Sequence, residues 1–423
     1  DVECFSDEAL ATYDLLCSLR KSYPDADFAF IMGSDWLVPG SLHWQGAGPD
    51  AWTSRNWDWK PGDPEETRTI LTGPKMLAEF DFLVIKRPGY TVPVTPDDPT
   101  GLMRYGPRIS WLAMPDGQTF IEGNASSEEI RKRTGVAARV RASITANFTS
   151  ANFRHSIDGL VPWGVVSYIF RHQFYCPAPI EPAKRLRVAV YGGAFDPVTN
   201  SHLTCAAEVV HSQCADEVWL IPCGPRPDKP NLTTPPLDRY CMCQIAVNTA
   251  FSADFPIRVN DIECFSDTAL FTYDLLCSLR ERHPNIDFCF IIGSDWLQPG
   301  ANMSTWTSAN HSWRPGDPDE ERLIVTGSKM LAEFDFLVIR RPGYELPSNL
   351  QDFGPRIKLL TMPEGQTFIE GNLSSTEIRK RTAFAARVRD AVSQRDFLGI
   401  DGLVATGVLA YIRRQGLYSM ALR

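Results

Sequence analysis

The chain has 423 residues, 43% of them apolar, enough for two or three domains with packed cores. The net charge of −9 argues against a nucleic-acid-binding protein, so an anionic ligand needs a local cluster of cations. No run reaches the roughly 18 apolar residues of a membrane-spanning helix and no signal peptide opens the chain, so no membrane association is expected. The first residue is Asp1, which predicts a fragment or a processed product.

The eleven cysteines form no metal or disulfide framework. Their number is odd, and Cys241 and Cys243 are too close for one half of a zinc site, with no second pair at ligand spacing. Reduced cysteines used as small apolar residues indicate an intracellular compartment, cytoplasm or nucleus.

An internal repeat organises the chain. Residues 1–40 match residues 261–300 at 29 of 40 positions, and the match resumes at 72–85 against 326–339 and at 123–133 against 371–381. It ends near Tyr175 and Tyr418, whereas the segment 186–260 has no counterpart before residue 1. We therefore expect a partial first copy at 1–176, which lacks its front half, a proline-rich linker at 177–185 and a complete domain at 186–423.

Three interpretations of the first copy remain open. The natural polypeptide is longer and has a full first domain, or the first copy is a degenerate structural lobe. In the third interpretation, residues 1–176 compete with residues 261–423 for the single front half at 186–260.

Strand and helix patterns alternate along the complete domain. The strands are expected at 186–190, 218–222, 257–259, 288–292, 334–339 and 357–360, with helices at 203–210, 237–251 and 271–282 and after Ser374 and Leu403. This alternation predicts an α/β fold, a parallel sheet with helices on both faces. Ligands of such sheets lie at the carboxyl ends of the strands, where Gly192–Gly193, Gly293–Asp295 and Ser374–Ser375 are expected to converge.

The first of these segments predicts a phosphate site. A short apolar strand is followed by Gly192 and Gly193 and then by a helix with His202 in its first turn. Glycines allow a sharp turn and close approach of the backbone to a ligand, and free N–H groups at a helix start favour an anion. The glycine pair alone is equally typical of a simple turn.

The longer string from Gly192 to His202, Gly-Gly-Ala-Phe-Asp-Pro-Val-Thr-Asn-Ser-His, resembles the signature of one nucleotidyltransferase superfamily. That superfamily contains the nicotinamide and nicotinate mononucleotide adenylyltransferases and the pantetheine-phosphate adenylyltransferases. The resemblance implies a Rossmann-like doubly wound sheet, duplicated here, and an ATP-binding turn that consists of Gly192, Gly193, Ala194 and Phe195, with His202 as a catalytic group.

The segment from Gly371 to Arg379 resembles the C-terminal phosphate motif of the same superfamily. By that resemblance Ser374, Ser375 and Thr376 hold the ATP phosphates and Arg379 adds a fixed positive charge. A structural alternative exists, because Ser374 and Glu377 have the spacing of a helix capping box.

The implied reaction is adenylyl transfer, in which a nucleotide phosphate displaces pyrophosphate from ATP. Positioning and charge stabilisation dominate such chemistry, and His202, Lys229 and Arg379 are expected to be the three cations around the triphosphate. A loop lysine such as Lys229 is as often a solvated surface residue. Mg²⁺ is expected to enter on the ATP phosphates, because the sequence shows no carboxylate cage.

Three features of the resemblance favour nicotinamide or nicotinate mononucleotide as the acceptor. Thr272 lies where the bacterial enzymes have a threonine at the pyridine substituent, and Gly293 and Asp295 match their ribose-binding Gly-Ala-Asp. Trp306 and Trp313 follow where the family has a tryptophan that stacks on the pyridine ring, although Trp306 could simply pack a loop.

The alternatives are a pantetheine-phosphate adenylyltransferase and a nucleotide-binding regulatory protein without turnover. Amide or acid preference stays open, as does assembly into a homo-oligomer.

Overall fold

The computed structural model describes residues 10–38, 48–87, 89–113, 127, 131, 161–172, 174, 185–226, 228–266, 268–298, 300–341, 343–369, 375–379 and 400–418. The chain divides into two compact units, Asp1–Ser126 and Ser127–Arg423. Of the predicted linker at 177–185, Arg185 alone is described.

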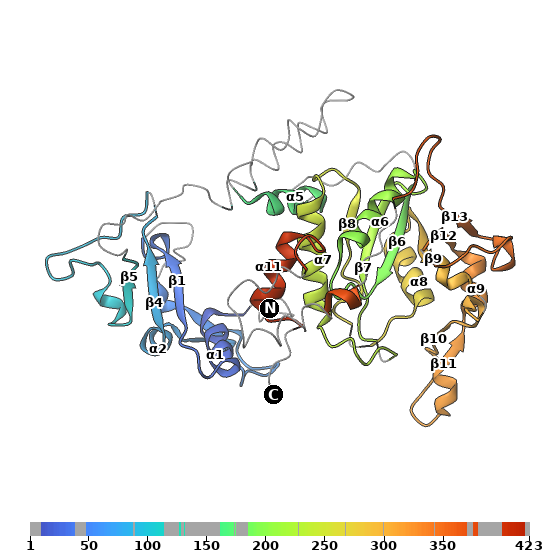
Figure 1. Cartoon of the computed structure of the whole chain (residues 1–423). Coiled ribbons are helices and arrows are strands. Elements are labelled where there is room, and N and C mark those ends of the chain that lie inside the picture. Colours follow the sequence, from blue (N-terminus) through green and yellow to red (C-terminus); the bar gives the residue numbers. More distant parts are fainter. Residues whose placement is uncertain are drawn as a thin grey trace, which may run out of the picture. The chain divides into compact units, whose positions relative to one another are not determined.

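The second unit contains a six-stranded parallel sheet (Figure 1). Its strands are β6 (Leu186–Gly193), β7 (Glu217–Pro222), β8 (Ile257–Val259), β9 (Ile286–Gly293), β12 (Asp335–Ile339) and β13 (Ile357–Leu359). They lie in the order β13-β12-β9-β6-β7-β8, so the direction of winding reverses between β6 and β9. The expected parallel α/β fold is confirmed, and ligands of such sheets bind at this reversal.

Helices cover both faces of that sheet (Figure 1). They are α5 (Trp163–Arg171), α6 (Asn200–His211), α7 (Pro236–Ala250), α8 (Thr272–Arg282), α9 (Gly327–Glu333) and α11 (Thr406–Gln415). Ala189 of β6 packs with α6, α7 and α11 in one apolar cluster, whereas Val188 and Val190 pack with α8 and α9 in another. The alternation of side chains along β6 thus builds a core on each face.

Several short elements between β9 and β13 were not expected from the sequence. The antiparallel pair β10 (Thr307–Ala309) and β11 (Leu323–Val325) forms a hairpin, and the 3₁₀ turns there are η5 (Ser294–Leu297), η6 (Met303–Thr305), η7 (Asp319–Arg322) and η8 (Leu350–Asp352). The apolar run of β11 has only three residues, shorter than the roughly four to eight residues that identify a strand from sequence, and all three are exposed.

The first unit repeats the back half of this arrangement. Its elements are α1 (Thr12–Ser22), β1 (Ala29–Gly33), η1 (Ser34–Leu37), η2 (Pro49–Ala51), β2 (Thr53–Arg55), η3 (Glu65–Thr67), β3 (Thr69–Leu71), α2 (Gly73–Glu79), β4 (Asp81–Ile85), η4 (Met103–Tyr105) and β5 (Ile109–Trp111). Strands β1, β4 and β5 form a parallel sheet in which Phe30 is opposite Phe82, as Phe290 is opposite Phe336 in the second unit. That the first unit derives from the same domain stays a prediction.

Among the described residues, no helix has both the length and the apolar character that crossing a membrane requires.

Candidate active site

The two glycine segments lie at the carboxyl ends of β6 and β9, the strands at which the sheet reverses. A Cβ atom on Gly192 would lie 3.1 Å from the Phe290 ring, and one on Gly193 would lie 3.1 Å from the Phe195 ring. Phe195 itself is 2% exposed and has a φ of 45°, a left-handed conformation that is rare for a large side chain. Close packing of aromatic rings therefore accounts for both glycines.

His202 lies in the first turn of helix α6 and is a neutral imidazole. The Thr199 backbone N–H donates to its Nδ1 at 3.0 Å, so the ring proton of the neutral form is on Nε2. Burial, with a smaller contribution from the positive charge of Arg341, lowers the pKa of His202 to about 4. His202 is therefore not one of the expected cations at neutral pH. It is an oriented N–H donor beside the amide groups of a helix start.

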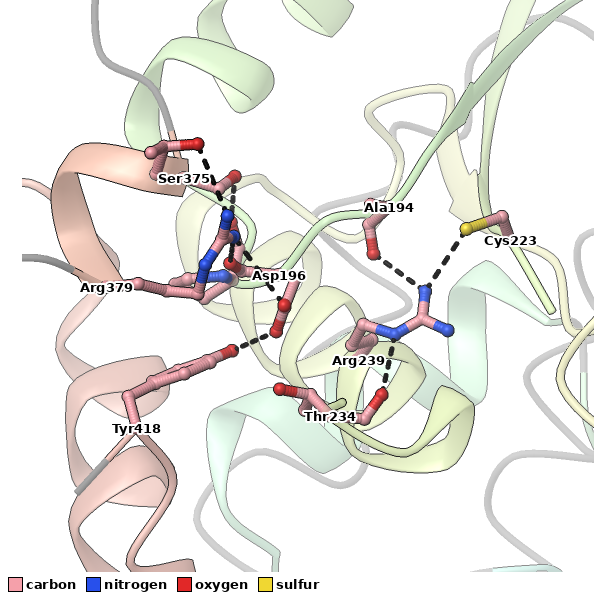
Figure 2. Close-up of polar contacts among 10 residues, drawn as sticks. Ala194, Asp196, Cys223, Thr234, Arg239, Ser375, Arg379 and Tyr418 are labelled. Atoms are coloured by element: carbon pink, nitrogen blue, oxygen red, sulfur yellow. Dashed lines mark hydrogen bonds and ion pairs between the residues drawn. The ribbon is translucent and has the colours of Figure 1, made fainter. Parts of the chain in front are cut away.

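The two segments that the sequence predicts to bind phosphate contact each other (Figure 2). The Ser375 hydroxyl donates to the carbonyl of Pro197 at 2.8 Å, and Arg379 Nη1 donates to the carbonyl of Asp196 at 2.5 Å. Arg379 Nη2 donates to Thr376 Oγ1 at 3.2 Å. Segments about 180 residues apart in the sequence thus meet at the turn that leads into the His202 helix.

Asp196 is the buried acceptor at this junction. It is 1% exposed, receives the Tyr418 hydroxyl at 2.7 Å and has a carboxylate oxygen 3.6 Å from Arg379 Nη1. Burial and the Asp196 carboxylate raise the pKa of Tyr418, which keeps the phenol protonated as a donor. The Arg379 side chain remains 34% exposed, so part of the guanidinium faces away from Asp196.

Arg239 of α7 joins the glycine turn to the loop after β7. It is 1% exposed and donates to the carbonyls of Ala194 at 2.8 Å and Thr234 at 3.1 Å (Figure 2). Glu263 supports the same loop by accepting the Gly224 N–H at 3.0 Å, and burial raises its pKa to about 7. Arg239 therefore holds the glycine turn and the loop after β7 together.

Lys229 is not brought into this cluster. Its side chain is exposed on the loop after β7, where its N–H closes a turn onto the carbonyl of Arg226 at 2.9 Å. Arg226 is engaged by Asp228 at 2.6 Å. The surface alternative that the sequence left open for Lys229 fits this position.

Asp295 forms an ion pair across the end of β9. Its Oδ2 is 2.9 Å from Arg341 Nη1, and a Cβ on Gly293 would come within 2.2 Å of its Oδ1. Only glycine at position 293 leaves room for this pair. Oδ1 of Asp295 is buried and has no hydrogen-bond partner among the described residues, so it is available to a ligand hydroxyl.

Two of the three predicted mononucleotide residues come from neighbouring elements. Thr272 is the first residue of α8, and two residues later Asp274 accepts the Ala309 N–H of β10 at 3.3 Å. Trp306 immediately precedes β10 and lies edge-on to Trp296, with ring centroids 4.8 Å apart. Trp313 lies beyond β10, where the Arg322 guanidinium covers its ring at 4.4 Å from the centroid.

The comparisons with known proteins agree on one family. The Cytidylyltransferase-like family model matches residues 190–381. The probable nicotinate-nucleotide adenylyltransferase of Corynebacterium kroppenstedtii is 32% identical over 233 residues, which cover 55% of this chain and 90% of that protein. The protein of the same name from Tropheryma whipplei strain Twist is 34% identical over 227 residues, or 54% of this chain and 97% of the relative. The chain belongs to the nicotinate-nucleotide adenylyltransferase family.

Among solved structures, Plasmodium falciparum nicotinic acid mononucleotide adenylyltransferase complexed with NaAD matches with a TM-score of 0.42 and 25% identity. The match covers 56% of this chain and 100% of that chain. The expected family and a nucleotidyltransferase activity are confirmed by the sequence relatives, whereas the first copy is not covered by the family model.

The site of this nicotinate-nucleotide adenylyltransferase family member contains groups that sequence reasoning missed. Arg341 was not predicted as a site residue. It follows a predicted strand, as Gly293 does, and this position could have identified it. Tyr418 gave no signal, because its contact with Asp196 joins residues 222 positions apart. Ser374 lies outside the described residues, so its predicted role stays a prediction.

Proposed function

We propose that the chain transfers the adenylyl group of ATP to nicotinate mononucleotide, giving deamido-NAD and pyrophosphate. The observation that carries this proposal is the contact of Ser375 and Arg379 with the Asp196–Pro197 turn. This contact joins the two segments predicted to bind phosphate beside the His202 helix. The names of the relatives from Corynebacterium and Tropheryma support nicotinate mononucleotide as the acceptor.

In the proposed reaction an oxygen of the mononucleotide phosphate attacks the α-phosphorus of ATP, and the bond to the pyrophosphate oxygen breaks. The protein supplies position and charge. Nε2–H of His202 donates to a phosphate oxygen, with its direction set by the Thr199 N–H on the opposite ring nitrogen. Arg379, held by the Asp196 carbonyl, adds a fixed positive charge at the same turn.

We infer that Mg²⁺ enters as the complex with ATP. Asp196 is already occupied by Tyr418 and Arg379. No group of three histidine, cysteine or acidic residues in the described ranges is arranged to hold a metal ion. Phosphate oxygens are ligands that Mg²⁺ prefers, which supports an ion carried on the triphosphate.

For the nucleoside parts, we propose that Asp295 accepts a ribose hydroxyl of the adenylate through its unpartnered Oδ1. The pyridine ring is assigned to the space near Thr272 and Trp306, because α8 and β10 meet through Asp274. Trp306 is the better stacking candidate, because the ring of Trp313 is covered by Arg322.

Pyrophosphate release measured in parallel with nicotinate mononucleotide, nicotinamide mononucleotide and phosphopantetheine tests the proposal. The highest kcat/KM is expected with nicotinate mononucleotide. Preference for phosphopantetheine would instead identify a pantetheine-phosphate adenylyltransferase. ATP binding without pyrophosphate release from any acceptor would identify a regulatory nucleotide-binding protein.

A further inference from the structure

Helix α5 comes from the first copy but packs in the second unit, against α7. Its inward residues are deeply buried: Val166 and Ser167 are 0% exposed and Ile169 is 6% exposed. In the internal repeat, α5 corresponds to α11, with Gly164 opposite Gly407 and Arg171 opposite Arg414. The helix that ends the first copy is therefore part of the core of the second domain.

Arg171 anchors α5 to the end of α7. It is 4% exposed and donates four hydrogen bonds, to Asn248 Oδ1 (3.2 Å) and to the carbonyls of Ser252 (2.9 Å), Phe255 (2.6 Å) and Ile257 (2.6 Å). Burial lowers its pKa to about 10, so the guanidinium remains charged at neutral pH. A cation at the C-terminal end of a helix is favourable, and here it also satisfies carbonyls of the connection to β8.

The corresponding helix α11 packs on α7 in a different way. Its Tyr411 donates to Asp238 at 2.7 Å, in the first turn of α7, whereas Arg414 is exposed. Helix α7 thus carries the terminal helix of each copy, and only α5 uses its arginine as a buried anchor. The relatives match 227 to 233 residues of this chain over 90–97% of their own length, a span that accommodates one copy.

We propose that the end of α7 and its connection to β8 form a docking site for a helix with a buried arginine, and that α5 of the same chain fills it. Through this helix the first copy stabilises the second domain, and residues 161–172 are a structural part of that domain. This inference is independent of the proposed reaction. Its tests measure amide hydrogen exchange, thermal unfolding and the formation of a disulfide, and none of them measures activity.

The first test compares Arg171→Met with Arg414→Met in the full chain, by hydrogen exchange and thermal unfolding. Met fills similar volume but donates no hydrogen bond, so in Arg171→Met the amides of residues 248–259 are expected to exchange at least about 10-fold faster. The unfolding midpoint falls by roughly 5–10 °C. Arg414→Met leaves both unchanged. Equal, small effects of the two substitutions would overturn the proposal.

A disulfide cross-link between α5 and α7 tests the proposal even if the Arg171→Met variant does not fold. A Cβ on Gly164 would lie 3.9 Å from Cγ2 of Thr249, so the two positions are in van der Waals contact across the α5–α7 packing. Gly164→Cys with Thr249→Cys should therefore form an intrachain disulfide under mild oxidation, seen as one joined peptide from a monomeric protein. The single-cysteine variants control for the eleven native cysteines. Absence of the link, or a cross-linked dimer, would contradict docking within one chain.

Discussion

Both units contain the same ion pair, but only the second unit contains the other segments of the candidate active site. Asp35 pairs with Arg87 at 2.8 Å beside Gly33, as Asp295 pairs with Arg341 at 2.9 Å beside Gly293. Strand β9 lies between β12 and β6, whereas β1 is the edge of its sheet among the described strands. The nearly identical local sequence therefore reproduces the local geometry, and the glycine turn with His202 exists in the second unit alone.

The largest effect is expected from His202, which has no counterpart in the first unit. His202→Gln keeps an acceptor for the Thr199 N–H, since glutamine suits this capping position, but it moves the phosphate donor. We expect kcat to fall about 10³-fold, on the order of 4 kcal/mol, with little change in mononucleotide affinity.

Thermal unfolding and steady-state kinetics on His202→Gln and His202→Ala together separate the two roles of the imidazole. The glutamine variant should recover stability but not turnover. A recovery of turnover, or equal loss of turnover and of mononucleotide affinity, would assign His202 a structural role only.

Patterns along the chain were sufficient to predict the six strands of the parallel sheet, because these depend on short segments, whereas the β10–β11 hairpin was missed. The neutral state of His202 was not predicted, since a sequence does not reveal that the ring is partly buried and that a backbone N–H occupies Nδ1. The Tyr418–Asp196 contact and the docking of α5 depend on long-range packing, so no local sequence pattern predicted them.

Equivalent isoleucine substitutions in the two units are expected to change the free energy of unfolding by different amounts. Ile291 is 5% exposed in β9, and the equivalent Ile31 is 59% exposed in β1. Ile291→Ala should lower the free energy of unfolding by about 3 kcal/mol, because it leaves a cavity in a closed core. Ile31→Ala should cost less than about 0.5 kcal/mol. Denaturant titration of both variants measures the difference, and similar losses would mean that β1 is covered in solution.

A smaller effect is expected from the paired arginines. Arg341→Met removes the partner of Asp295 and a positive charge near His202, so kcat/KM should fall roughly 10- to 100-fold, or about 1.4–2.7 kcal/mol. Arg87→Met removes the matching pair in the first unit and should leave pyrophosphate release unchanged. A comparable loss in Arg87→Met would show that the first unit contributes to the reaction.

The smallest effect concerns pH. Burial raises the pKa of Glu263 to about 7, above its unfolded value, so the folded state holds a proton that the unfolded state has lost. The free energy of unfolding should therefore fall as pH rises from about 4.5 to 7, by up to about 1.4 kcal/mol per pH unit. Urea unfolding at pH 5.5 and 6.5 should show this slope in the wild type and a flatter one in Glu263→Gln. An identical slope in both proteins would contradict the assignment.

A crystal structure of the full chain with deamido-NAD tests the central claim most directly. The account predicts a single dinucleotide in the second unit, with Nε2 of His202 and the Arg379 guanidinium both within hydrogen-bond distance of its phosphates. A dinucleotide bound in the first unit, or phosphates that contact neither group, would contradict it.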